Sequence, residues 1–152
     1  LNEEYNNKFI LLIPGVSLSG KKKQWNPTYF AEIANYYENK NYKICVVGTK
    51  DDYSSVEPIL HQCKNIINAI DSSPPNVIYS IARKSSLVIT NDTGPGHVAS
   101  LSGAKILWIL NDNNISKANI KNDNNQFKIF SSEINKISSK QVINFIKKNN
   151  LL

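Results

Sequence analysis

Residues 87–110 constrain the fold of this chain more than any other stretch. An apolar run at 87–90 is followed by the turn Asn-Asp-Thr-Gly-Pro, by a short apolar helix pattern that ends at Gly103, and by a second apolar run. This order predicts a strand, a tight turn, a helix and a second strand. Backbone N–H groups at the start of a helix are unpaired and partly positive, so the turn suits a phosphate or another anion.

The same alternation of strand and helix patterns runs along the whole chain. It favours an α/β fold in which a doubly wound, mainly parallel sheet of about six strands carries helices on both faces. We expect strands at residues 9–13, 42–47, 65–69, 86–90, 104–110 and 127–130, and helices at 27–37, 51–62, 77–82, 94–102 and 139–146.

Three residues refine the expected helices. Pro27 is expected in the first turn of its helix, where a missing N–H group does no harm. Pro58 falls late in the helix predicted at 51–62, which we expect either to start near this residue or to bend there. Ser139 is expected to cap the last helix.

The domain organisation follows from length and composition. The chain has 152 residues, which is enough for one domain with a real core, and we assign that domain to residues 9–152. Residues 1–8 are expected to form a linker or a frayed end, and segments 16–26 and 111–125 to form polar loops. No methionine occurs, even at position 1, so we expect the chain to be part of a longer protein.

The charge balance narrows the class of partner. The net charge is +6, which favours an anionic ligand. The lysines are mostly scattered and no array of aromatic residues lies beside a basic groove, so nucleic-acid binding is not expected. No apolar run approaches the ~20 residues that span a bilayer, and the chain does not begin with a signal-peptide pattern.

The two cysteines do not indicate a metal site or a disulfide framework. Cys45 lies within an apolar run, where a small buried core residue is expected, and Cys63 stands alone. Free cysteines fit a reducing cytosol. Trp25 and Trp108 are expected in the core or in packing over the site, and Lys21 and Lys22 in solvent.

Three loops with chemically useful residues follow predicted strands. They span residues 14–25, 48–52 and 91–97. The carboxyl ends of parallel strands lie at the same edge of a sheet, and ligands bind there in open α/β folds. We therefore expect the three loops to form one site.

The motifs in these loops resemble a known family. Pro14-Gly15-Val16-Ser17 is followed by Lys23-Gln24-Trp25-Asn26-Pro27, then by Val47-Gly48-Thr49 with Asp51-Asp52, and then by Thr90-Asn91-Asp92-Thr93-Gly94-Pro95-Gly96-His97-Val98-Ala99. Over about residues 9–110 the chain resembles the C-terminal half of the family 9 glycosyltransferases, the heptosyltransferases of lipopolysaccharide core assembly. The Asp-Thr-Gly-Pro-x-His-x-Ala run is the specific part of this resemblance.

The resemblance implies a cytoplasmic enzyme with the GT-B architecture, in which two Rossmann-like domains face each other across a cleft. The C-terminal domain would bind the nucleotide-sugar donor, typically ADP-heptose. An N-terminal domain, absent from this chain, would bind the glycan or lipid-linked acceptor and supply the catalytic base. By this analogy the chain needs no cofactor or metal ion and cannot transfer sugar alone. Contact with the membrane would be peripheral, at the inner face of the inner membrane.

The resemblance also assigns roles to individual residues. Lys23 would contact the donor phosphates, with Ser17 or Ser19 in the same phosphate loop. The residues matched to the segment that touches the diphosphate and the donor sugar are Asp92, Thr93, Gly94 and His97. Asp51 or Asp52 would hold the ribose, and Ile78 and Tyr79 would lie near the base.

Three places depart from the family pattern. Gly48-Thr49-Lys50-Asp51-Asp52 stands where the family often has a glutamate after a Gly-Gly pair. Gly96 stands where the family commonly has methionine, and Leu110-Asn111-Asp112-Asn113-Asn114 replaces a frequent Phe-Gly-Pro-Thr. We expect Gly94 and Gly96 to let a ligand approach the backbone closely.

Other readings of the same residues remain open at this stage. Asp92 bonds sugar hydroxyls or caps the helix, and His97 contacts ligand or a neighbouring loop. Asp92, His97 and Ser100 contain the residue types of a hydrolytic triad, but no nucleophile elbow accompanies them. The alternatives to a transferase are a non-catalytic nucleotide-sugar binding module and a phosphate-binding protein related to nucleotide-sugar epimerases.

Overall fold

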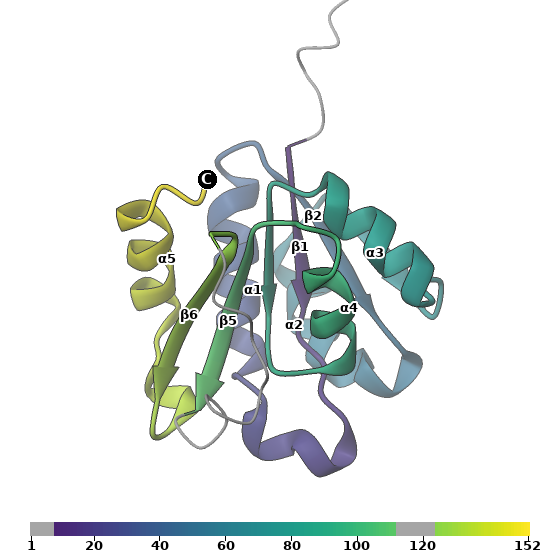
Figure 1. Ribbon diagram of the computed structural model, residues 1–152, viewed down its shortest axis with the longest axis horizontal. Coiled ribbons are helices and arrows are strands. Elements are labelled where there is room, and N and C mark those ends of the chain that lie inside the picture. The colour runs from purple at the N-terminus through teal and green to yellow at the C-terminus, as the bar shows by residue number, and fades with distance from the viewer. Residues whose placement is uncertain (1–7, 112–123) are drawn as a thin grey trace, which may run out of the picture.

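The computed structural model describes residues 8–111 and 124–152, and this part of the chain forms a six-stranded, all-parallel sheet (Figure 1). The strand order is β3-β2-β1-β4-β5-β6, so the order reverses between β1 and β4. This arrangement confirms the predicted Rossmann-like, doubly wound fold. The strands are β1 (Phe9–Ile13), β2 (Lys43–Gly48), β3 (Ile66–Ile70), β4 (Leu87–Thr90), β5 (Ile106–Asn111) and β6 (Gln126–Ser131).

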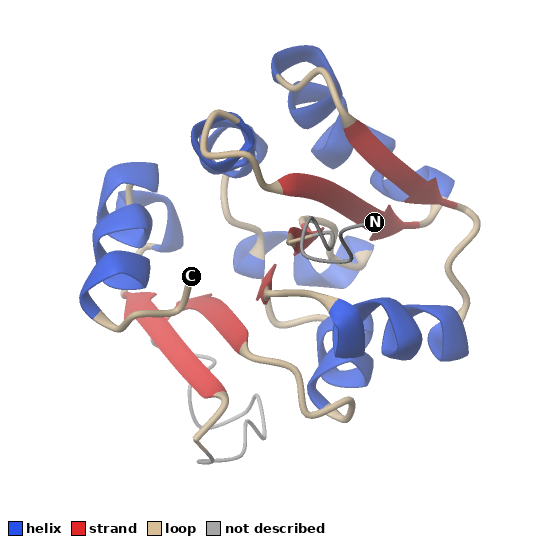
Figure 2. Ribbon diagram, turned by 90° about the horizontal axis from the view of Figure 1, so that it is seen from above, coloured by secondary structure: helices blue, strands red, loops and turns tan. Residues whose placement is uncertain are grey.

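Helices cover both faces of the sheet, as the view from above shows (Figure 2). One face packs against α1 (Pro27–Glu38), α2 (Tyr53–Gln62) and α5 (Ser139–Lys148). The other face packs against α3 (Pro75–Lys84) and α4 (Gly94–Ser100). Each face therefore has its own apolar core, and the central strands between them are buried on both sides.

The central strands are continuous apolar runs because neither of their faces meets water. In β1 and β4, Leu11 lies opposite Val88 and Leu12 opposite Ile89, and all four side chains are fully buried. The edge strand β3 is different, since the side chain of Ile67 is 48% exposed. Burial thus rises from this edge toward the strands that carry the site.

The structure differs from the prediction in two segments, and each contains a 3-10 helix that was not predicted. The segment expected to be a polar loop contains a 3-10 helix, η2 (Leu18–Lys23). Its residues lack the apolar periodicity of an amphipathic helix, so the pattern gave no sign of it. The helix expected from Asp51 begins as the 3-10 turn η3 (Lys50–Asp52) and continues as α2, which runs through Pro58.

The last helix is capped one residue earlier than expected. Ser138, not Ser139, accepts a hydrogen bond from the backbone N–H of Gln141 at 3.1 Å. The Gln141 side chain in turn accepts from the Ser138 backbone N–H at 2.7 Å, which completes a capping box. Pro27 occupies the start of α1 as predicted, after the N-cap residue Asn26.

Most of the two segments expected to be irregular lies outside the described residues. This holds for the predicted linker at 1–8, apart from Lys8, and for the predicted loop at 111–125. Within the latter, Asn111 is the last residue of β5.

Both cysteines are buried and free, as expected for Cys45. Burial raises the pKa of the Cys45 thiol to about 11 and also that of the Cys63 thiol to about 11. In the second case the nearby Glu38 carboxylate adds to the effect of burial on the pKa. These values predict thiols that react slowly in the folded chain.

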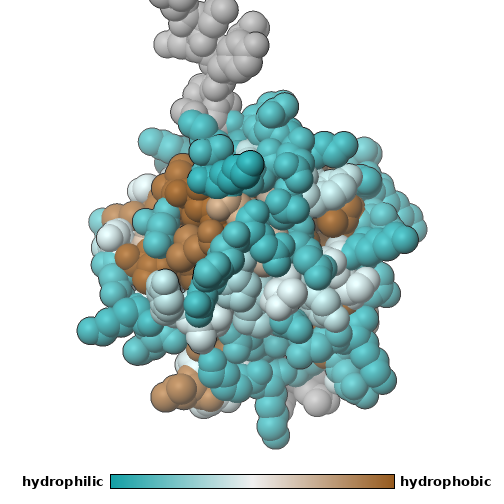
Figure 3. Space-filling view, turned by 180° about the vertical axis from the view of Figure 1, so that it is seen from behind, coloured by the Kyte–Doolittle hydropathy of each residue, from teal (hydrophilic) through white to brown (hydrophobic). Residues whose placement is uncertain are grey.

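The outer surface is largely polar. Seen from behind, the molecule is mostly hydrophilic, with one larger group of apolar side chains on one side (Figure 3). Over the residues that the structure describes, no helix is long and apolar enough to cross a bilayer.

Candidate functional site

The site lies at the carboxyl edge of the sheet, where the strand order reverses between β1 and β4. The loops after β1, β2 and β4 meet there around a cavity of about 810 Å³, as the sequence predicted. Nine of the expected site residues line this cavity: Ser17, Ser19, Lys23, Asp51, Asp52, Asp92, Thr93, Gly94 and His97. Gly15, Val16, Leu18, Gly20, Lys21, Thr49 and Pro95 line it as well.

Asn91 joins the loops on either side of this reversal point. Its side chain is completely buried, and its Nδ2 donates to the carbonyl oxygen of Pro14 at 3.0 Å. Its Oδ1 accepts from the backbone N–H of Trp25 at 3.0 Å. Asn91 is not among the residues predicted for the site, although an amide directly after a buried strand is a polar group that needs such partners.

Trp25 fixes the end of the segment that carries Lys23. Its ring is fully buried and packs against Tyr29 and Phe30, with ring centroids 5.4 and 5.0 Å away. Its Nε1 donates to the carbonyl oxygen of Ile137 at 2.7 Å. Because Trp25 is anchored in this way, the backbone two residues earlier has little freedom to move Lys23 out of the site. The core position expected for Trp25 is confirmed.

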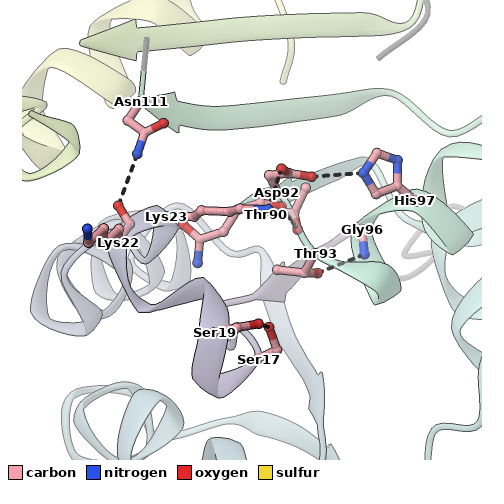
Figure 4. A network of polar contacts seen from close by, with 11 residues as sticks. Ser17, Ser19, Lys22, Lys23, Thr90, Asp92, Thr93, Gly96, His97 and Asn111 are labelled. Carbon is pink, nitrogen blue, oxygen red and sulfur yellow. Dashed lines mark hydrogen bonds and ion pairs between the residues drawn. The ribbon is translucent and has the colours of Figure 1, made fainter. Parts of the chain in front are cut away.

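Asp92 stands between two cationic or potentially cationic groups (Figure 4). Its Oδ2 lies 3.1 Å from Lys23 Nζ, and its Oδ1 lies 2.9 Å from His97 Nε2. The Asp92 side chain is only 9% exposed, whereas those of Lys23 and His97 are each 39% exposed. Charge-assisted hydrogen bonds of this kind hold the three side chains in one geometry.

Thr93, and not Asp92, caps α4. The Thr93 Oγ1 accepts from the backbone N–H of Gly96 at 3.1 Å, which overturns the capping role considered for Asp92. The amide of Gly94 makes no hydrogen bond within the described residues, and Pro95 has no N–H group. The start of α4 therefore offers the Gly94 amide to a ligand, and one amide fewer than a helix start without proline would offer.

The two glycines of the turn have different roles. A Cβ on Gly96 would lie 2.7 Å from Thr90 Oγ1 and 3.0 Å from Trp108 Cζ3, so this glycine is needed for packing α4 on the sheet. The expectation that Gly96 admits a ligand is therefore wrong, because the buried ring of Trp108 fills that space. A Cβ on Gly94 would meet no atom within 4 Å.

The first loop presents groups with spare hydrogen-bonding capacity. Ser17 Oγ and Ser19 Oγ lie 3.1 Å apart, and both residues are exposed. Lys21 and Lys22 are exposed as predicted, but Lys21 also lines the cavity, which the sequence analysis missed. The Lys21 Nζ donates to Gln24 Oε1 at 3.3 Å.

The two candidate ribose carboxylates are not equivalent. Asp52 Oδ2 accepts from the backbone N–H of Thr49 at 2.8 Å, and its carboxyl group lies over Gly15, where a Cβ would be 2.2 Å from Asp52 Oδ1. Asp52 thus builds the loop. Asp51 is exposed at the cavity and makes no hydrogen bond or ion pair within the described part of the chain.

The structure does not bring the proposed base contacts to the cavity. Ile78 is 4% exposed and packs in the core beneath α3, and Tyr79 is 37% exposed on the same helix. Neither residue is among those that line the cavity.

The geometry also separates this site from a hydrolytic triad. Ser100 Oγ donates to the backbone carbonyl oxygen of His97 at 2.7 Å, and not to its imidazole ring. The His97 ring instead lies against Trp108, with centroids 4.9 Å apart. No group of three or more His, Cys, Asp or Glu side chains is placed to hold a metal ion in residues 8–111 and 124–152.

Comparisons with known proteins agree with this architecture. A glycosyltransferase family 9 structure from Veillonella parvula superposes with a TM-score of 0.85 at 21% identity, covering 99% of this chain and 48% of that chain. Escherichia coli ADP-heptose lipopolysaccharide heptosyltransferase II gives a TM-score of 0.78 at 17% identity over the same shares. The E. coli heptosyltransferase WaaC with ADP gives 0.80 at 12% identity, covering 94% of this chain and 44% of that chain.

The chain thus spans about half the length of these structures, and identities this low establish the fold alone. No curated protein sequence matches the chain significantly. The sequence profile of glycosyltransferase family 9 (heptosyltransferase) matches residues 2–140, which is most of the chain. The chain therefore belongs to glycosyltransferase family 9, the heptosyltransferase family.

Proposed function

We propose that this chain is the donor-binding domain of a glycosyltransferase that moves a heptose-like sugar from a nucleotide diphosphate sugar to a lipopolysaccharide or another glycan acceptor. The observation that carries this proposal is the convergence of Lys23, the Ser17 and Ser19 hydroxyls and the free Gly94 amide on one cavity at the reversal point of a family 9 domain. Neighbouring structures of the fold were obtained with ADP and with ADP-2-deoxy-2-fluoro heptose. ADP-heptose is accordingly the first donor to test.

The proposed chemistry follows from where charge develops. As the bond between the sugar and the diphosphate breaks, negative charge accumulates on the departing phosphate. A preorganised hydrogen-bond donor aimed at such charge typically stabilises the transition state by about 3 kcal/mol. Lys23 supplies the cation, and the Gly94 amide and the two serine hydroxyls supply neutral donors.

The remaining polar groups suit the rest of the donor. Asp51 is the carboxylate without a protein partner on the described chain, so it is the better candidate for the ribose hydroxyls. Asp92 and His97 face the cavity beside Lys23 and are placed to bind hydroxyls of the donor sugar.

This chain spans about half the length of the neighbouring structures. The proposal therefore assigns acceptor binding and the catalytic base to a second domain of the kind that those longer structures leave room for. The enzyme would act in the cytoplasm, at the inner face of the inner membrane. The family match gives no support to an epimerase-like protein or to a non-catalytic module.

Titration with ADP tests the proposal directly. We expect the backbone resonances of Gly94 and His97 to shift in a ¹⁵N-labelled sample, and no shift at millimolar ADP would refute donor binding. Lys23→Ala should weaken the binding of ADP about tenfold or more and leave the affinity for adenosine almost unchanged, since only ADP carries phosphates. Lys22→Ala is the matched control, because this exposed lysine does not line the cavity. Equal weakening of ADP and adenosine by Lys23→Ala would contradict the phosphate role.

A further inference from the structure

The carboxylate of Asp92 is nearly closed to solvent, and protein groups occupy both of its oxygens. Lys23 Nζ lies 3.1 Å from Oδ2 and His97 Nε2 lies 2.9 Å from Oδ1, while the side chain is only 9% exposed. A ligand hydroxyl that is to take the place at Oδ2 requires the ammonium group to move aside. Donor binding and the Lys23–Asp92 ion pair therefore compete for the same atoms.

Of the two partners of Asp92, Lys23 is the exchangeable one. Its long side chain is 39% exposed and lines the cavity, so its ammonium group can turn toward a ligand while its backbone stays fixed. The imidazole of His97 has less freedom, because its ring lies against the buried Trp108.

We propose that Lys23 changes partners when the donor binds. Its ammonium group passes from Asp92 Oδ2 to a donor phosphate oxygen, and a hydroxyl of the donor sugar then donates to Oδ2 in its place. This inference rests on the proposed function and adds that Asp92 determines preference for the sugar-bearing donor over the bare nucleotide.

The preference has a physical cause. A buried carboxylate that loses a charged partner without a replacement is destabilised. ADP takes the Lys23 ammonium but has no sugar hydroxyl to offer Asp92, whereas the sugar nucleotide has both groups. Asp92 thus opposes the binding of ADP, the product, and permits the binding of the substrate.

Other charges at the cavity provide the controls. Lys21, Asp51 and Asp52 also line it, and Asp52 is engaged by the backbone N–H of Thr49. Asp51→Asn removes the same charge from the same cavity without touching the Lys23 ion pair. ADP and ADP-heptose carry the same ribose, so this variant should change both dissociation constants by the same factor.

The test measures the dissociation constants of ADP and ADP-heptose for the wild-type chain and for Asp92→Asn, which keeps the side-chain shape. We expect the wild-type chain to prefer ADP-heptose, and the variant to bind ADP about tenfold more tightly and so lose most of that preference. In a Lys23→Ala background, the same substitution should change ADP affinity by less than about twofold, because the competing ammonium is gone.

Three results would overturn the inference. The first is that Asp92→Asn changes the dissociation constants of ADP and ADP-heptose by the same factor. The second is that Asp51→Asn reduces the preference for ADP-heptose as strongly as Asp92→Asn does. The third is that Asp92→Asn still tightens ADP binding in the Lys23→Ala background. In these cases both ligands still bind and the proposed function stands. Absence of any binding to the wild-type chain removes the proposed function together with the inference. A wild-type-like ¹⁵N–¹H spectrum of each variant shows that the fold is intact.

Discussion

The turn between β4 and α4 and the loop between β1 and α1, which contains η2, line the same cavity, yet their polar groups are used differently. In the turn, Asn91, Asp92 and Thr93 all bond to other parts of the protein. In the loop, Ser17 and Ser19 bond to each other and stay exposed. Protein partners therefore hold the side chains of the turn in place, whereas the two serine hydroxyls of the loop keep hydrogen-bonding capacity for a ligand.

This contrast predicts that removing a protein–protein hydrogen bond or packing contact of Asn91 or Gly96 lowers stability, whereas removing the serine hydroxyls of the loop changes binding. The largest effect is expected for Asn91→Ala. It leaves the buried Trp25 N–H without a partner and removes the shorter of the two hydrogen bonds to the Pro14 carbonyl oxygen, so the free energy of unfolding should fall by about 3 kcal/mol. Urea denaturation measures this change. Ser17→Ala is the control in the loop and should stay within about 0.5 kcal/mol of wild type.

Gly94 and Gly96, both in the first turn of α4, test within one helix whether a residue matters for packing. Gly96→Ala should lower the free energy of unfolding by about 2 kcal/mol, because its Cβ has no room beside Thr90 and Trp108. Gly94→Ala should leave stability unchanged or raise it by about 0.5 kcal/mol, since its Cβ meets open space. Equal thermal shifts for the two variants would show that the turn is not a rigid packed wall.

A smaller effect, on binding alone, is expected in the loop. Replacing Ser17 and Ser19 together by alanine should weaken the binding of ADP about tenfold, because roughly one or two neutral hydrogen bonds to the ligand are lost. Calorimetric titration measures the affinity, and urea denaturation should give a wild-type curve. A large loss of stability in this variant would break the distinction between the two regions.

A last effect, confined to alkaline pH, concerns the buried thiols, which report on unfolding independently of the site. Unfolded thiols ionise near pH 9, whereas burial raises the pKa of both Cys45 and Cys63 to about 11. The folded chain therefore keeps protons that the unfolded chain loses, and stability should fall as the pH rises from 9 toward 11. A thiol reagent at pH 8 should label Asn91→Ala faster than wild type, and the Ser17 and Ser19 variant at the wild-type rate.

The fold could be predicted because long apolar runs leave few alternatives. Each central strand was found within two residues at either end, since a segment buried on both faces must be continuously apolar. Convergence of the three loops followed from the parallel order alone. The 3-10 helix η2 was missed because its polar residues carry no periodic signal.

The site could be predicted only to the level of which residues meet. That Asp92 bonds Lys23 and that Trp108 fills the space over Gly96 depends on how elements far apart in the sequence pack together. That Thr93 and not Asp92 takes the cap depends on the residue at which α4 begins. Ile78 illustrates the same limit, because helical spacing placed it on an apolar face but could not show that this face is core and not cavity.

The hydrogen bond from Trp25 Nε1 to the carbonyl oxygen of Ile137 ties the carboxyl-terminal part of the chain to the segment that carries Lys23. A second hydrogen bond, from the Asn26 backbone N–H to Asn135 Oδ1 at 2.8 Å, reinforces this connection. The two hydrogen bonds join parts of the chain more than a hundred residues apart, within and directly after η5 (Ile134–Lys136). Deleting residues 134–152 would remove both bonds together with the buried side chains of Val142, Ile146 and Leu151. The last eighth of the sequence therefore helps to hold Lys23 in position, although it contributes no residue to the cavity wall.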